Sequence, residues 1–187
     1  MNDEIIGMIL SLIGMALTII SFQARSKRML LVWQTAGSTF FLISYLFSDG
    51  GIAVFLNIIF LVRNILSMKT EHSTQRVRNL VCLGLCLAHT ATFVIYSSVT
   101  GEWSFWGALP VVGAIFGTIA VAQTDAIRLR LWKYGDSFAW LFFNAHLGLG
   151  ALGGTLCEIF NEISLAVSLY RFRRNGGKTG TTPTKEG

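Results

Sequence analysis

Long apolar runs separated by short polar segments make up almost the whole of this chain. Each run extends over about 18 to 20 residues, which is the length an α-helix needs to cross a bilayer's apolar core of about 30 Å. The pattern therefore predicts an all-α membrane protein with seven transmembrane helices. We expect these helices at residues 4–23, 29–48, 51–68, 79–98, 104–123, 131–148 and 151–170.

The order of segments in the first half of the chain returns in the second half, about 100 residues later. In both halves an apolar run ends at a glutamine, a basic segment follows, a tryptophan opens a second run, and a third run carries Asn57 or Glu158. The shared register indicates an internal repeat of three-helix units, a construction common among transporters. The recurring pairs are Thr18 and Thr118, Gln23 and Gln123, Arg28 and Arg128, Trp33 and Trp132, and Ser38 and Ser137.

The fourth predicted helix has no counterpart in the repeat. A three-helix unit starts and ends on opposite sides of a membrane, so two such units run parallel only if a single helix returns the chain between them. We therefore expect a 3+1+3 arrangement of two parallel repeats. Its parts are a first three-helix bundle at 1–70, an inner loop and linker helix at 71–100, a second three-helix bundle at 101–172, and a disordered cytoplasmic tail at 173–187.

The composition of the chain agrees with a membrane location. Hydrophobic residues make up 52% of the chain and charged residues 13%, and the mean hydropathy is +0.57. Such a chain has too little polar surface to cover a soluble globule of this length. The composition therefore excludes a soluble globular protein.

The basic residues predict the orientation. All but one of the 15 lysines and arginines fall on the same side of the predicted helices, and by the positive-inside rule that side is the cytoplasm. The N-terminus is then outside and the C-terminus inside. The net charge of +5 reflects this topology and an affinity for anionic lipid headgroups, not nucleic-acid binding. The residues are Arg25, Lys27, Arg28, Lys69, Arg76, Arg78, Arg128, Arg130, Lys133, Arg171, Arg173, Arg174, Lys178 and Lys185.

Polar side chains within the predicted spans are the candidates for function, because such groups are costly in a bilayer and face the interior of the bundle. Glu158, Asn161 and Glu162 share one face of the seventh helix, and Asn57 and Asn64 are nearly in line on the third. We predict that these five residues line a central cavity and bind a solute, with the equivalent positions Asn57 and Glu158 facing each other. A purely structural interhelical hydrogen bond is the alternative for Asn57.

Arg63 is the one basic residue away from the inner flanks, and it needs a partner or access to the membrane surface. We expect an ion pair between Arg63 and an acidic residue of the second half, either Glu162 or Asp136. Asp136 has Lys133 as an alternative partner. An ion pair of this kind would give the glutamates of the seventh helix a structural role instead of a role in binding.

The first half resembles a SemiSWEET unit from residues 21–27 through Tyr45 to Asn57, and residues 4 to 172 resemble the SWEET architecture. The resemblance implies a seven-helix fold with a substrate-facing Asn in the third helix of each triad. The chain departs from the related PQ-loop proteins at Phe22 and Ala122, where those proteins place a proline before the glutamine. A proline hinge of the SWEET kind is therefore absent.

The segment Gly150-Ala151-Leu152-Gly153-Gly154-Thr155, followed by Glu158 and the cluster at 171–174, is similar to the YgjV-type family of bacterial inner-membrane proteins. This resemblance implies a multi-pass protein of the bacterial inner membrane, related to the SWEET and PQ-loop group.

Two functions of different class fit these features. One is a permease or facilitator for a small polar solute, monomeric or as a homo-oligomer, which uses the cavity between the repeats. The other is a non-transporting assembly or regulatory factor whose polar groups only hold the helices together. The sequence contains no hydrolase, metalloprotease or phosphate-binding motif, so we expect no enzyme, no cofactor and no metal site.

Overall fold

The computed structural model describes residues 2–21, 27–70, 73–123 and 126–174, and within them the chain is helical apart from short connections. The long apolar stretches form helices because a helix pairs its backbone polar groups internally. The helices are α1 (Asn2–Ser21), α2 (Lys27–Leu46), α3 (Gly51–Lys69), α4 (Gln75–Thr100), α5 (Phe105–Ala122), α6 (Ala126–Leu147) and α7 (Leu152–Arg174), with a short 3-10 helix η1 (Gly148–Ala151) before α7.

The helices match the predicted runs in order but extend beyond several of them. Helix α4 begins at Gln75 instead of residue 79, α6 begins at Ala126 instead of residue 131, and α7 continues to Arg174. Helical hydrogen bonding continues past the apolar core, whereas hydropathy marks only the core. Lys133, which is counted among the basic residues of the inner side, lies well inside α6, whose first residue is Ala126. The predicted disordered tail at 173–187 is wrong for its first two residues, which are the last of α7, and its remainder lies outside the described residues.

Within the described residues, four helices are long and apolar enough to cross a membrane: α1 from Asp3, α3, α4 and α5. Helix α4 also exposes large aliphatic side chains along its length, as expected of a surface that faces lipid. Examples are Leu80, Leu83, Leu87, Ile95 and Val99. Helices α2, α6 and α7 carry more polar residues, many of which face the interior of the bundle.

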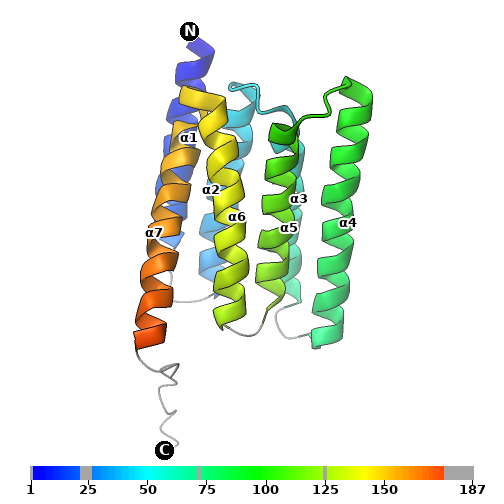
Figure 1. Cartoon of the computed structure of the whole chain (residues 1–187), viewed down its shortest axis with the longest axis vertical. Helices are drawn as coiled ribbons and strands as arrows, with labels where there is room; N and C mark the ends of the chain where they lie inside the picture. Colours follow the sequence, from blue (N-terminus) through cyan, green and yellow to red (C-terminus); the bar gives the residue numbers. More distant parts are fainter. Residues whose placement is uncertain (1, 22–26, 71–72, 124–125, 175–187) are drawn as a thin grey trace, which may run out of the picture.

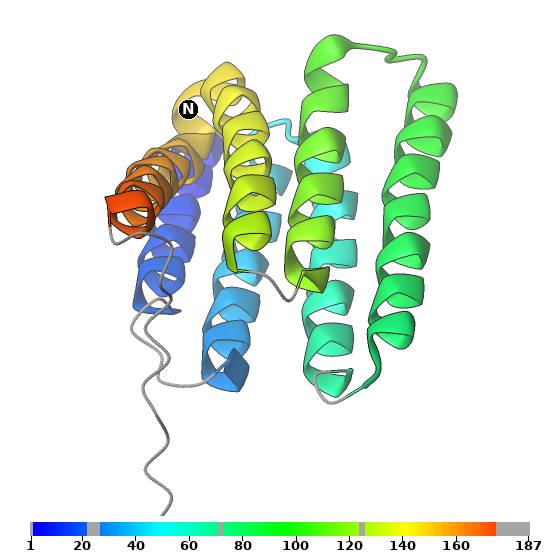
Figure 2. The ribbon, with the colours of Figure 1, turned by 60° about the horizontal axis from the view of Figure 1, so that its bottom comes forward.

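Six of the helices form a closed ring. Helix α1 packs against α2 and α7, α2 packs against α3, α3 against α5, α5 against α6, and α6 against α7. Helix α4 lies outside this ring against α3 and α5, at one edge of the bundle (Figures 1 and 2). The start of α1 and the end of α7 lie at opposite ends of the bundle, and the odd-numbered helices all run in the direction of α1 (Figure 1).

Small residues allow a close helix crossing between α1 and α7. The backbone N–H of Gly153 donates a hydrogen bond to Ser11 Oγ at 3.0 Å. A β-carbon added at Gly153 would lie 2.1 Å from the carbonyl carbon of Ser11, so a larger residue does not fit without moving a helix. This crossing closes the ring between its first and last helices.

An apolar core fills the end of the ring that carries the N-terminus. Its residues come from the last turns of α2 and α6, from η1, and from the first turns of α3 and α5. This core, together with the α1–α7 crossing, leaves room for polar side chains farther along the helices. The core residues are Tyr45, Ile52, Ala53, Leu56, Val111, Trp140, Phe143 and Ala151.

Candidate functional site

A cavity of about 80 Å³ lies in the middle of the ring, and we call it the central cavity. Its walls are formed mainly by α2, α6 and α7, with contributions from α1 and α3. A volume of this size has room for a few water molecules. The hydrogen-bonding and charged side chains in its wall are Thr18, Gln34, Ser38, Tyr45, Asn57, Lys133, Asp136, Asn144, Glu158 and Asn161.

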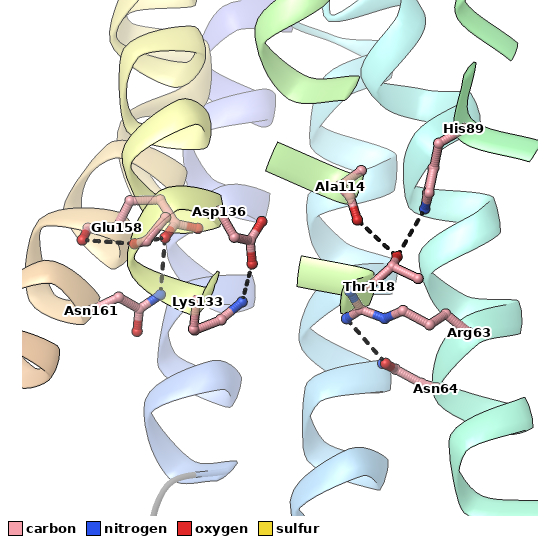
Figure 3. A network of polar contacts seen from close by, with 10 residues as sticks. Arg63, Asn64, His89, Ala114, Thr118, Lys133, Asp136, Glu158 and Asn161 are labelled. Atoms are coloured by element: carbon pink, nitrogen blue, oxygen red, sulfur yellow. Dashed lines mark hydrogen bonds and ion pairs between the residues drawn. The ribbon is translucent and has the colours of Figure 1, made fainter. Parts of the chain in front are cut away.

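Glu158 is held by two neighbouring side chains. Ser137 of α6 donates a hydrogen bond to Oε2 of Glu158, and Asn161, one turn farther along α7, donates to the same oxygen at 3.0 Å (Figure 3). Ser137 is fully buried and Asn161 nearly so. The carboxylate therefore has a fixed position at the wall of the cavity, between α6 and α7.

Asn57 lies in the opposite part of the wall, on α3. Its Nδ2 donates to the carbonyl oxygen of Ala53 at 2.9 Å, one turn earlier in the same helix. The bond stays within α3, so the alternative of an interhelical hydrogen bond for Asn57 is not found. Asn57 and Glu158 thus line the same cavity from α3 and α7 without bonding to each other.

Tyr45 and Asn144 join α2 to α6 across the cavity. The Tyr45 hydroxyl donates to Oδ1 of Asn144 at 2.6 Å, and the Tyr45 ring stacks on Trp140 with centroids 6.2 Å apart. Tyr45 and Asn144 are 99 positions apart, which is also the separation of the recurring pair Trp33 and Trp132. This bond marks the side of the cavity that faces the apolar core.

Asp136 is an acceptor for Lys133, one turn earlier on α6 (Figure 3). Asp136 is 2% exposed, and its Oδ1 has no hydrogen-bond partner. The predicted alternative pairing of Asp136 with Lys133 is therefore present. It is an ion pair inside the helix bundle, where a charge left alone is costly.

Arg63 is also 2% exposed and lies close to Asp136 without bonding to it. A β-carbon added at Gly117 would lie 2.6 Å from Asp136 Oδ2 and 3.0 Å from Arg63 Nη1, so these two atoms are less than about 6 Å apart, within the range of charge attraction. The guanidinium carbon lies 3.5 Å from the Phe60 ring centroid, and Nη2 donates to Asn64 at 3.4 Å. Nε and Nη1 of Arg63 have no hydrogen-bond partner.

The structure thus places Arg63 within about 6 Å of Asp136, one of its two expected partners, but the two side chains form no direct ion pair. Asp136 is near Arg63, but it bonds to Lys133. Glu162 forms no ion pair with Arg63, because its carboxylate lies near the hydroxyls of Tyr134 and Ser137, and neither of its oxygens has a partner in hydrogen-bonding geometry. The guanidinium of Arg63 instead contacts the ring of Phe60 and donates a hydrogen bond to the side-chain amide of Asn64.

Two of the five predicted binding residues do not reach the central cavity. Asn64 is fully buried between Arg63 and Thr35, to which its Nδ2 donates at 3.4 Å. Glu162 lies one turn beyond Glu158 and is not in the wall either. Asn57, Glu158 and Asn161 are the predicted residues that the structure brings together around the cavity.

A second buried polar cluster lies near Arg63 (Figure 3). The Thr118 hydroxyl donates to the carbonyl oxygen of Ala114 at 2.7 Å and lies 3.4 Å from Nε2 of His89. His89 is fully buried, and its Nδ1 has no partner. This cluster connects α4 to α5 and is not part of the cavity wall.

A family model described as Imp-YgjV, bacterial inner membrane protein, matches residues 5–176. The chain belongs to this family. The match extends over all seven helices and the whole central cavity, so the cavity is a feature of a bacterial inner membrane protein. No curated protein and no solved structure matches the chain.

In this inner membrane protein, the hydrogen bond between Tyr45 and Asn144 was not predicted from the sequence. Lys133 and Asp136 are three residues apart, a spacing that places both on one helix face, and their ion pair is the alternative that was predicted for Asp136. The separation of Tyr45 and Asn144 equals that of the recurring pair Trp33 and Trp132, and this signal could have connected them. Their meeting depends on packing that the sequence alone does not give.

Proposed function

We propose that this protein is a permease or facilitator for a small polar solute, which passes through the central cavity. The observation that carries the proposal is that Asn57, Glu158 and Asn161 surround a cavity inside a ring of membrane helices. Polar side chains and a cavity in the interior of a membrane protein are typical of a pathway for a solute. The proposal includes no catalytic step, cofactor or metal.

The proposal includes a specific arrangement of the membrane helices. Seven membrane spans in a 3+1+3 arrangement would make α1–α3 and α5–α7 two parallel repeats and α4 the linker. The packing supports this view: α2 lies between α1 and α3 as α6 lies between α5 and α7, and α4 is outside the ring. The bond between Tyr45 and Asn144 joins equivalent positions, as expected near a two-fold axis between parallel repeats.

The orientation that we propose has the N-terminus outside and the C-terminus in the cytoplasm. Among the described residues, basic residues lie at the end of α3 and at the starts of α4 and α6, which are at the end of the bundle opposite to the start of α1 (Figure 1) and where they would meet anionic headgroups. Reporter fusions after residues 72 and 180 should read as cytoplasmic, and a fusion after residue 101 as external. Any other pattern of reporter activity would refute this orientation.

A binding screen tests the function. Purified protein in detergent micelles is screened by thermal shift against sugars, nucleosides, vitamins and amino acids. A ligand at a hundred times its dissociation constant stabilises the folded state by about 2.7 kcal/mol, which raises the melting temperature measurably. We expect at least one class of polar solute to do so.

Two glutamates on one helix provide the matched variants. Glu158→Gln changes the wall of the cavity, whereas Glu162→Gln changes a carboxylate one turn away from it. We expect Glu158→Gln and Asn57→Leu to weaken binding of the solute at least tenfold while Glu162→Gln leaves it unchanged. If all three proteins fold and bind alike, or no solute binds the wild type, the non-transporting alternative is favoured.

A further inference from the structure

A second cavity, which we call the outer pocket, lies at the end of the bundle that carries the N-terminus. Its volume is about 180 Å³, and its wall combines the start of α3, the end of α4, the start of α5 and the end of α6. No residue lines both the outer pocket and the central cavity. Phe143, a member of the apolar core, closes the base of the outer pocket.

The charges of the outer pocket are negative. Asp49 and Glu102 are in its wall, and the wall contains no lysine or arginine. The wall also contains the imidazole of His146. Two helices begin and two helices end at the pocket, so their dipoles largely offset each other and the carboxylates set the sign of the potential. This potential attracts cations and repels anions.

Aromatic rings form another part of the same wall. Trp106 stacks on His146 with centroids 4.2 Å apart and the ring planes 3° from parallel, and Trp106 remains 40% exposed. Tyr96 reaches over the first turn of α3, where a β-carbon at Gly51 would lie 2.2 Å from its hydroxyl oxygen. Faces of Trp and Tyr rings bind organic ammonium groups through their negative quadrupole.

Ser97 provides an independent indication of a ligand. Its side chain is fully buried, it lies in the wall of the outer pocket, and its Oγ has no hydrogen-bond partner. Two other hydroxyls of α4 bond to their own helix: Thr90 donates to the carbonyl oxygen of Cys86 at 3.0 Å, and Thr100 donates to that of Tyr96 at 2.9 Å. A buried hydroxyl without a partner costs free energy, and a ligand that bonds to it would recover this cost.

We propose that the outer pocket binds a small organic ammonium compound, whose charge lies between Asp49 and Glu102 and whose body contacts Trp106. A bare metal ion is disfavoured, because among the described residues no three histidine, cysteine, aspartate or glutamate side chains are close enough to hold one. Ser97 adds a hydrogen bond to a polar group of the ligand. The inference does not depend on transport through the central cavity.

The ammonium group has two possible sources. It belongs either to a free amine outside the cell or to the ethanolamine headgroup of a lipid, since the pocket opens at an end of the membrane helices. Both sources present the same chemistry to the carboxylates and the indole. The experiment therefore first measures the binding of soluble ammonium compounds and then tests whether a lipid headgroup competes with them.

The test uses the full chain in maltoside micelles, which contain no ammonium group. Binding of ethanolamine and tetramethylammonium is measured by calorimetry, with ethylene glycol as the neutral probe. We expect both cations to bind and ethylene glycol not to bind. Asp49→Asn combined with Glu102→Gln should weaken binding about tenfold, because two largely exposed charge contacts are lost.

Matched variants separate this site from the general charge of the surface. Asp3→Asn combined with Glu4→Gln removes two carboxylates near the same end of the bundle but outside the pocket, and should change affinity less than twofold. Ser97→Ala should weaken ethanolamine about fivefold, the value of one neutral hydrogen bond, without loss of thermal stability. Thr90→Ala, in the same helix but outside the pocket, should leave binding unchanged.

Equal binding of ethylene glycol and ethanolamine would overturn the proposal, and so would an unchanged affinity in the variant that lacks both pocket carboxylates. The lipid arm adds phosphatidylethanolamine or phosphatidylglycerol to the micelles. Competition of phosphatidylethanolamine with ethanolamine identifies the headgroup as the source, and the absence of competition identifies a free amine. A solute screen that fails for the central cavity leaves these results unaffected.

Discussion

Asp136 should contribute more to the stability of the bundle than Arg63, although they are close together. Asp136 bonds to the partly exposed Lys133 and lies less than about 6 Å from the buried Arg63, so one carboxylate compensates two cations. At this separation and an effective dielectric constant of 20, the attraction between Arg63 and Asp136 is about 3 kcal/mol. Removing the carboxylate abolishes this attraction and that of Lys133 together.

The prediction is tested with Arg63→Met, Asp136→Asn and the protein that carries both changes. We expect Asp136→Asn to lower the free energy of unfolding by about 3 to 5 kcal/mol, the usual cost of removing one partner from a buried ion pair. Arg63→Met should cost less, because Asp136 keeps Lys133 and the chain loses a cation with two unpaired nitrogens. The double variant should be more stable than the sum of the single effects indicates.

The measurement is unfolding of the purified protein in mixed micelles, followed by helical circular dichroism as the fraction of denaturing detergent rises. Glu162→Gln is the control, since its carboxylate lies in the same bundle without an ion pair to Arg63. If the effects of Arg63→Met and Asp136→Asn add within about 0.5 kcal/mol, the two charges are not coupled and the reasoning is refuted.

Two other predictions use the same unfolding assay. Gly153→Ala should cost about 3 kcal/mol or more through a backbone clash with α1, whereas Gly84→Ala, which meets nothing within 4 Å, should be neutral or stabilise α4 by up to about 1 kcal/mol; equal effects would exclude a tight α1–α7 crossing. Tyr45→Phe should cost about 1 to 3 kcal/mol because Asn144 loses its donor, whereas Tyr170→Phe, at a residue that is 66% exposed, should cost nothing measurable.

The helices themselves could be predicted well from the sequence. A bilayer fixes the length of an apolar run and forces its backbone to form hydrogen bonds within the run, so each run is expected to form an α-helix. The ends of the helices could not be predicted as well. Arg128 and Arg130 are too polar for the apolar core, but they extend α6 toward its start, where the hydropathy gives no signal.

The candidate site was predicted in part, and the misses have one cause. Helical spacing shows which residues share a face, but it does not show at which depth the face borders a cavity. Asn57 and Asn64 are nearly in line on α3, yet Asn57 faces the cavity and Asn64 is buried against Thr35 of α2. In the same way Glu158 reaches the cavity, and Glu162, one turn farther, does not.

The distribution of satisfied and unsatisfied polar groups agrees with the transport function that we propose. A network that only holds helices together gains most when every buried polar atom has a partner. Glu158 fits that description, since Ser137 and Asn161 both donate to it. Asp136 and Arg63 do not, because they lie close together inside the bundle with Oδ1, Nε and Nη1 unpaired. A protein that changes between two arrangements can pair such atoms in one arrangement and leave them unpaired in the other, whereas a static bundle would carry their cost permanently.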